Sequence, residues 1–284
     1  MKKVARDVFG LGFAVSRGLI PLMARRHIVA WVGRHEALPY REQLAIELLR
    51  DFAERDPNAN PRFLWARHLA YAQTFQAERR FGAERIHQSR RLLFDDLRAF
   101  LQQQGIDPEA DIRSVLEVGS SLGYLLHHLE TGMFRSATSL EGIDIDRTAI
   151  DEGAAYLASI GSSVKLTMAD MGELETVLAG RKVDVILCAG VLMYVPEDDA
   201  RAIVRSIMGH TNVVAVFAGL AHPERDNSTL VHSAIRERDA TFIHDLDGMV
   251  RDAGGHVAWR RWEGPRDVDG NTIYFVFARP GDAA

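Results

Sequence analysis

The chain has 284 residues, of which 47% are hydrophobic and 26% charged. This indicates one large or two smaller globular domains and excludes disordered, collagen-like and coiled-coil proteins. The single cysteine, Cys188, excludes a disulfide within the chain and a metal site built on several thiolates, so we expect a reducing, cytoplasmic setting and no metal. The net charge of −5 argues against a dedicated nucleic-acid-binding protein.

The first 35 residues are basic, with seven lysines and arginines against one aspartate, while the rest of the chain is acidic. An apolar run over Val8–Val15 is interrupted by Arg17 and Pro21, too early for a membrane span, and no clean signal-peptide cleavage site follows it. We therefore expect a helical arm that packs on its own domain or on a partner subunit. A basic amphipathic helix lying on an anionic membrane is the alternative.

Residues 1–110 are predicted to form a helical N-terminal region. A helical stripe runs through 41–56, a turn cluster occupies 56–61, and a long helical pattern follows over 63–104 with a possible break at Gly82. The aromatic residues of this pattern suit either a lid or a helix–core interface: Phe63, Trp65, Tyr71 and Phe75. Its arginines are interpreted as a solvated helix face: Arg79, Arg80, Arg85, Arg90 and Arg91.

Residues 111–284 alternate short apolar runs with helical patterns, which predicts a second domain of α/β type. Strands are expected at 115–118, 139–145, 164–168, 183–188, 213–218, 256–262 and 272–278. The last two strands are separated by a polar loop, 264–271, without a helix, so they must be antiparallel. The predicted fold is a doubly wound, mostly parallel seven-stranded sheet with an antiparallel last strand.

Several helix boundaries have their own signals. Asp146 is a plausible N-cap. Pro196 and three following acidic residues open another helix, and Gly209 is expected to stop it. A further helix is expected around 246–253.

The segment 116–123 (LEVGSSLG) is the candidate ligand-binding turn, because it connects a predicted strand to a predicted helix. Glycines in such a turn let a ligand approach the backbone, and Gly123 allows close helix packing. An acid that accepts ribose hydroxyls is expected about 20 residues later, at the end of the second strand. Asp144 lies 21 residues past Gly123, so both halves of a nucleoside site are present in order.

The pattern Glu117-x-Gly119-x-x-x-Gly123 resembles motif I of the S-adenosylmethionine-dependent methyltransferases with a Rossmann-like fold, usually written E/D-x-G-x-G-x-G. Further stretches resemble this family in the same order, over about residues 112–280: 142–146, 169–171, 183–195 and 253–255. Ser121 replaces the middle glycine. A serine fits there if its backbone avoids a strained positive φ, and its hydroxyl is a candidate to bond the cofactor's carboxylate.

The resemblance implies S-adenosylmethionine as cofactor and S-adenosylhomocysteine as product. The resemblance assigns the following cofactor-binding residues: Glu117, Gly119, Ser120 and Ser121 line the methionine part, Gly123 completes the cofactor-binding motif, Asp144 and Ile145 hold and cover ribose and adenine, Asp170 and Met171 read the adenine edge, and Ala189 and Gly190 border the sulfonium. The alternative for Gly123 is that it is glycine for packing alone.

The acceptor is expected to be an oxygen or nitrogen of a small-molecule metabolite. Some family members that methylate bases or glutamine carry Asn/Asp-Pro-Pro-Tyr/Phe after the fourth strand, where this chain has 188–191 (CAGV). A hydroxyl acceptor needs a general base, for which His222 and His244 are candidates near the carboxyl edge of the sheet. Tyr194 is a candidate to wall or bond the acceptor.

Three alternatives remain open. The chain could be a non-catalytic cofactor-binding partner or regulatory protein of the same fold, or a methyltransferase for a membrane-associated lipid-like acceptor. A nicotinamide oxidoreductase is disfavoured by the glycine spacing. The expected partner is the small-molecule acceptor, with no nucleic acid; a membrane surface and a homodimer stay open.

Overall fold

The computed structural model describes residues 86–236, 241–268 and 271–281, together with Ala24, Trp65, Phe81 and Gly82. The expectations for 1–35, 41–56 and the lid lie outside these ranges. The helices are α6 (Gln88–Gln103), α7 (Tyr124–Gly132), α8 (Arg147–Ser159), α9 (Leu174–Leu178), α10 (Glu197–His210) and α11 (Leu246–Asp252), with short 3-10 turns η3 (Met171–Glu173), η4 (Leu192–Tyr194) and η5 (Asn227–Thr229).

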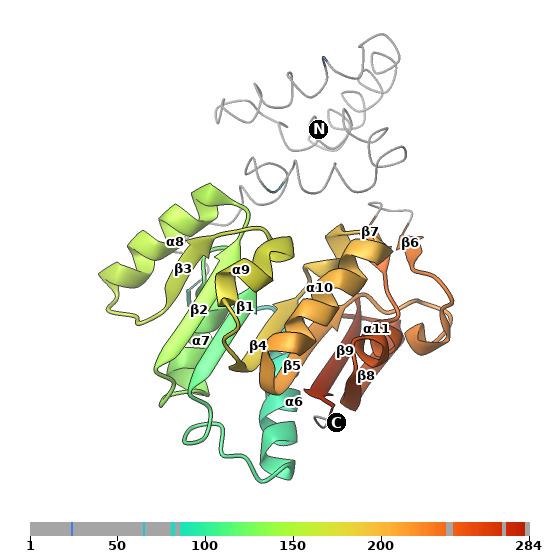
Figure 1. Ribbon diagram of the computed structural model, residues 1–284, viewed down its shortest axis with the longest axis horizontal. Helices are drawn as coiled ribbons and strands as arrows, with labels where there is room; N and C mark the ends of the chain where they lie inside the picture. The colour runs from blue at the N-terminus through green and yellow to red at the C-terminus, as the bar shows by residue number, and fades with distance from the viewer. Residues whose placement is uncertain are drawn as a thin grey trace, which may run out of the picture. The chain divides into compact units, whose positions relative to one another are not determined.

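The strands form a seven-stranded sheet in the order β3-β2-β1-β4-β5-β9-β8 and a separate two-stranded hairpin (Figure 1). Their bounds are β1 (Ser114–Val118), β2 (Ser139–Asp144), β3 (Lys165–Met168), β4 (Val183–Ala189), β5 (Thr211–Gly219), β6 (Ala234–Arg236), β7 (Thr241–Ile243), β8 (Gly255–Val268) and β9 (Asn271–Pro280). The predicted fold class is confirmed: β1 to β5 pair in parallel, and β9 pairs antiparallel with both β5 and β8.

Helices cover both faces of the sheet because successive residues of a buried strand point to opposite sides. One core contains the apolar residues of α6 and α7 with Val185 and Leu187 of β4. The other contains those of α9, α10 and α11 with Ile186 and Cys188. Figure 1 shows α10 and α11 in front of the sheet and α7 behind it. The strand β4 is therefore buried on both faces, as its continuous apolar run predicted.

The topology fixes where a ligand can bind. Strand β1 pairs with β2 on one side and with β4 on the other, so the chain order reverses at this point. In such sheets ligands bind outside the carboxyl ends of the strands next to the reversal. This places the segments that follow β1, β2 and β4 at one edge.

Some boundaries differ from the predictions. The helix α10 runs through Gly209 to His210, and β5 begins at the next residue. Strand β8 continues through most of the expected 264–271 loop to Val268, which is buried. The hairpin β6–β7 was not predicted, because two three-residue strands are too short to show an alternating pattern. The cap at Asp146 is confirmed by its bond from the amide of Ala149 (3.1 Å).

Gly153 brings α8 against the turn that follows β1. A methyl group added at Gly153 would lie 2.4 Å from the carbonyl oxygen of Leu122, a backbone atom that cannot rotate away. We expect Gly153→Ala to lower the free energy of unfolding by about 1–3 kcal/mol in denaturant titrations. Gly209→Ala is the matched control, since nothing lies within 4 Å of its added carbon, and it should be neutral or stabilising by up to about 1 kcal/mol. Equal effects of the two variants would contradict this packing.

Candidate active site

The turn 119–123 between β1 and α7 is anchored to the end of β2. The amides of Gly119 and Ser120 both donate to the carbonyl oxygen of Ile143, at 2.8 and 2.9 Å. Gly119 and Gly123 both have a φ of +76°, a backbone region that side chains with a Cβ rarely adopt. These two positions therefore need glycine, whether or not a ligand is bound.

Asp144, at the end of β2, accepts hydrogen bonds from two backbone amides. Its Oδ2 accepts from the amide of Ser121 at 2.8 Å, and its Oδ1 accepts from the amide of Asp146 at 2.9 Å. Burial nevertheless raises the pKa of Asp144, against the lowering effect of these amides. A carboxylate offers about four acceptor positions, so two backbone bonds leave capacity for hydroxyl groups.

Ser121 does not meet the condition that its backbone avoid a positive φ. Its φ is +49°, a left-handed conformation that costs a non-glycine residue roughly 1–2 kcal/mol. That conformation aims its amide at the carboxylate of Asp144, and a hydrogen bond to a charged group offsets a cost of this size. The backbone amide of Ser121 thus links the first strand's turn to the second strand's acid.

The end of β4 lies against the same turn. Val191 follows β4, and its Cγ2 would be 2.3 Å from a methyl group placed on Gly119. Gly190 has a φ of +76°, and its amide donates to the carbonyl of Ala218 at 2.7 Å. The structure therefore brings Gly119, Ala189 and Gly190 together, as their predicted shared site requires.

Two buried polar atoms at this edge accept no hydrogen bond from the described part of the chain: Oε2 of Glu117 and Oγ of Ser120. Glu117 is only 3% exposed, and burial raises its pKa well above the ordinary value, with the charge of Asp144 adding to the effect. Buried polar atoms of native proteins are nearly always paired, so an orphaned pair at one edge points to a missing ligand or water.

Arg90 contacts the end of β4, whereas its arginine-rich sequence predicts a solvated helix face. From α6 its guanidinium donates to the carbonyl of Ala189 at 3.0 Å, and it lies 2.5 Å from where a Gly190 methyl group would be. Its charge lowers the pKa of Glu117, opposing burial. No signal within the arginine-rich pattern separates Arg90 from its neighbours, because its partner is a backbone carbonyl 99 positions away.

The predicted adenine-side residues follow β2 and β3. Asp170 caps η3, with its Oδ1 accepting from the amide of Gly172 at 2.8 Å, and Met171 begins that turn. Ile145 directly follows Asp144. Their contacts with a nucleobase stay a prediction.

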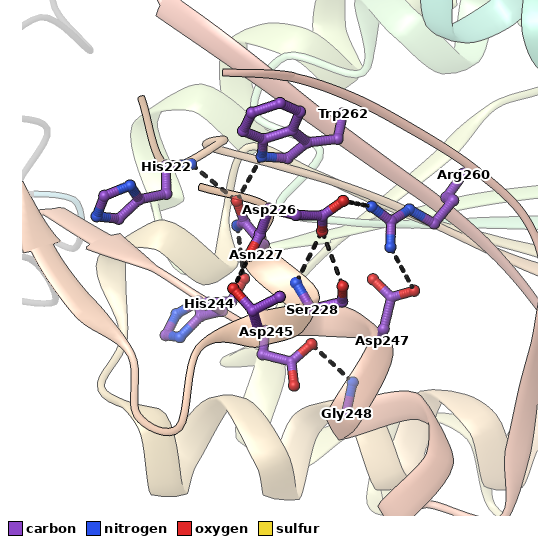
Figure 2. A network of polar contacts seen from close by, with 11 residues as sticks. His222, Asp226, Asn227, Ser228, His244, Asp245, Asp247, Gly248, Arg260 and Trp262 are labelled. Atoms are coloured by element: carbon purple, nitrogen blue, oxygen red, sulfur yellow. Dashed lines mark hydrogen bonds and ion pairs between the residues drawn. The ribbon is translucent and has the colours of Figure 1, made fainter. Parts of the chain in front are cut away.

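The three candidate catalytic residues lie on different segments: Tyr194 follows β4, His222 follows β5, and His244 directly follows β7. His222 is half-buried, and its Nδ1 accepts from the amide of Glu224 at 3.2 Å. Figure 2 shows its ring directed away from the polar network around Asn227. Tyr194 ends η4 and is also half-buried. The roles of His222 as a base and of Tyr194 as an acceptor contact stay predictions.

His244 does not suit the role of a base in this arrangement. Its ring is 4% exposed, and both nitrogens have partners: Nε2 is 2.9 Å from the carbonyl oxygen of Leu192, and Nδ1 is 2.7 Å from Oγ of Ser233. Burial also lowers its pKa. A base needs an available lone pair, so His244 is better placed to position the chain than to remove a proton.

Across the described ranges, His, Cys, Asp and Glu side chains form no cluster suited to a metal ion. Among the residues with assigned positions, no helix has both the length and the apolar character needed to cross a bilayer.

Comparisons with known proteins fit this geometry. Residues 115–212, from β1 into the start of β5, match the family model described as a methyltransferase domain. This segment of the chain is therefore similar to a methyltransferase domain. No curated protein matches the chain.

Solved structures share the fold of this chain at low sequence identity. One is magnesium protoporphyrin IX methyltransferase from Synechocystis PCC 6803 with bound SAH, with 16% identity, a TM-score of 0.51, and coverage of 72% of this chain and 92% of that one. Another is the PH0226 protein from Pyrococcus horikoshii OT3, with 12% identity, a TM-score of 0.50, and coverage of 74% and 98%. At these identities the likeness concerns the fold.

The burial of Glu117 predicts an unusual pH dependence of stability. Because folding raises the pKa of Glu117, its protonated side chain stabilises the fold fully at pH values below its ordinary pKa of 4.5. This stabilisation is lost as the pH rises through the pKa of the folded state. We therefore expect Glu117→Gln to stabilise the ligand-free protein at neutral pH, by roughly 1–3 kcal/mol, with the gain vanishing towards pH 4.5. Denaturant titrations across pH measure this.

Glu141→Gln is the control of opposite sign. Its bidentate bonds to Arg181 lower the pKa of Glu141, so this carboxylate stabilises the fold above 4.5 and loses that effect as pH falls. The pair is partly exposed, so the loss at neutral pH should stay below about 1 kcal/mol. A destabilised Glu117→Gln protein at neutral pH would contradict the account of Glu117.

Proposed function

We propose that this methyltransferase binds S-adenosylmethionine across the carboxyl ends of β1, β2 and β4 and transfers its methyl group to an oxygen or nitrogen of a small molecule. The observation that carries the proposal is the orphaned pair, Oε2 of Glu117 and Oγ of Ser120, beside a glycine turn that is bonded to Asp144. When bound, the cofactor would supply a methyl group on a positively charged sulfur: the acceptor's lone pair would form a bond to the methyl carbon as the carbon–sulfur bond breaks, and S-adenosylhomocysteine would leave with that electron pair.

The charges around the turn suit a zwitterionic amino acid end. Glu117 is a buried acid without a bonded partner for Oε2, and Arg90 is a half-buried cation held over the end of β4. An ammonium group beside Glu117 would favour its ionised form, and a carboxylate group would find a two-pronged donor in Arg90. Glu117 and Arg90 would therefore orient the methionine part, with Glu117 beside its ammonium group and Arg90 beside its carboxylate.

The nucleoside part would extend from the turn towards β2 and β3. Asp144 is held rigid by backbone amides and offers its remaining acceptor positions to the ribose hydroxyls. Ile145, Asp170 and Met171 follow in the direction of the adenine. Ala189 and Gly190, at the end of β4, would border the reacting sulfur.

The residues on the acceptor side act mainly by position. A displacement needs proximity, alignment and a deprotonated acceptor, and little other machinery. Tyr194 would wall the acceptor, and His222 would take its proton where the acceptor is a hydroxyl. The chain's negative net charge and the CAGV sequence after the fourth strand favour a small metabolite over a nucleic acid, and a cytoplasmic setting remains our expectation.

Removing the carboxylate of Asp144 tests the nucleoside half of the site. Asp144→Ala should weaken binding of S-adenosylhomocysteine by about 1–3 kcal/mol in isothermal titration calorimetry, through loss of charge-assisted bonds to the ribose. Asp146→Ala removes the neighbouring carboxylate and the cap of α8, so it should lower thermal stability and change the dissociation constant by no more than about twofold. An unchanged dissociation constant in Asp144→Ala would contradict the assignment of Asp144 to the ribose hydroxyls.

Arg90 and Arg91 offer a matched test of the methionine half. Arg90→Gln removes a cation beside Glu117 and should weaken binding by about 1–3 kcal/mol, measured in the same way. Arg91 is exposed and its Nε donates to the carbonyl of Ile86 (3.0 Å), so Arg91→Gln should leave binding unchanged. Similar losses in both variants would indicate a general charge effect instead of a specific contact.

Turnover tests the proposal as a whole. The purified protein is incubated with S-adenosylmethionine and a panel of hydroxylated and aminated metabolites, and acceptor-dependent formation of S-adenosylhomocysteine is measured. The proposal predicts transfer to at least one of them. Tight cofactor binding without any transfer would favour a non-catalytic role.

A further inference from the structure

Asn227 joins the segments that follow β5 and β7 to strand β8. The residue is completely buried, and its amide group has four partners. Its Nδ2 donates to the carbonyls of Leu220 (2.9 Å) and His244 (2.8 Å). Its Oδ1 accepts from the amide of His222 (2.8 Å) and from the indole of Trp262 (3.1 Å), as Figure 2 shows. A buried amide with all four positions used holds its partners in one arrangement.

His244 carries this arrangement to the segment that follows β4. A carbonyl can only accept, so Nε2 carries the proton and donates to Leu192, and Nδ1 accepts from the hydroxyl of Ser233. The amide of Ser233 in turn donates to Oε2 of Glu197, at the start of α10 (2.9 Å). One imidazole therefore ties the turn η4 to the segment that leads into the hairpin β6–β7.

The turn that His244 holds is in contact with the glycine turn. Leu192 directly follows Val191, the residue that leaves no room for a side chain at Gly119. The amide of Tyr194 donates to the carbonyl of Val191 at 3.0 Å, and that of Val195 donates to Leu192 at 3.0 Å. The bond from His244 to Leu192 therefore fixes a short turn whose first residue, Val191, packs against Gly119.

We propose that Asn227 and His244 are a pair of positioning residues that hold the turn 191–195 in the place that cofactor binding requires. Asn227 fixes the backbone of His244, and the Nε2 proton of His244 fixes Leu192. The effect reaches Gly119 through Val191. This proposal rests on the proposed function, because the affected ligand is S-adenosylhomocysteine or its methylated form.

Two substitutions of His244 separate its two bonds. His244→Gln can retain a donor at the place of Nε2 and loses the acceptor for Ser233, while His244→Asn retains a group at the place of Nδ1 and loses the donor to Leu192. His210→Gln is the matched control. His210 is another buried histidine with a backbone carbonyl partner, Ser206 (2.9 Å), but it lies at the end of α10, beside the opposite edge of the sheet.

The readouts are amide hydrogen exchange at 194–195 and the dissociation constant for S-adenosylhomocysteine. We expect His244→Asn to speed exchange and weaken binding by about tenfold each, and His244→Gln to stay within about threefold of the wild type. His210→Gln should lower stability and change neither readout. Equal behaviour of the Asn and Gln variants, or the same changes in the His210 variant, would overturn the proposal.

The wild-type protein supplies a test that needs no variant. Nitrogen NMR of labelled histidine should show His244 as the neutral tautomer protonated at Nε2 at pH 7, and a proton on Nδ1 would overturn the assignment. Failure of the wild type to bind S-adenosylhomocysteine would count against the proposed function alone, since tautomer and exchange are measured without the ligand.

Discussion

The hydrogen bond from the amide of Ser121 to the carboxylate of Asp144 is the contact on which the site depends. It exists because β1 pairs in parallel with β2, which sets the two carboxyl ends side by side. The amides of Gly119 and Ser120 add two bonds to Ile143, so the turn after β1 is fixed to the end of β2 at three points. The strained backbone of Ser121 is the local cost of that geometry.

The electrostatics of the same edge are unfavourable without a ligand. Glu117 is buried beside the negative charge of Asp144, and Arg90 opposes this only in part. Such an arrangement is poor for stability but suits a ligand that carries an ammonium, a carboxylate and a pair of hydroxyls. The proposed binding site and the unfavourable electrostatics of this edge then have one cause, which is the burial of Glu117 beside Asp144.

The seven strands of the sheet and the order of its cofactor segments follow from the sequence, because buried strands leave continuous apolar runs bounded by turn residues. The glycine turn and Asp144 could be found for the same reason, since both are local signals at a strand end. The positive φ of Ser121 could not, because a hydrogen bond from a distant strand overrides the local preference.

Arg90 and His244 show a second limit. The side chain of Arg90 meets a carbonyl 99 positions away, and the ring of His244 meets one 52 positions away. Backbone carbonyls have no sequence signature, so the sequence could suggest neither the contact of Arg90 with the end of β4 nor the structural bonds of His244. The hairpin β6–β7, which lies between β5 and α11, was missed because its strands are too short to show a period.

A crystal structure of the protein with S-adenosylhomocysteine tests the central claim most directly. The account predicts the homocysteine end between Glu117 and Arg90, the ribose hydroxyls on the carboxylate of Asp144, and the sulfur beside Ala189 and Gly190. A ligand that lies away from the 119–123 turn, or one whose ribose does not reach Asp144, would contradict it.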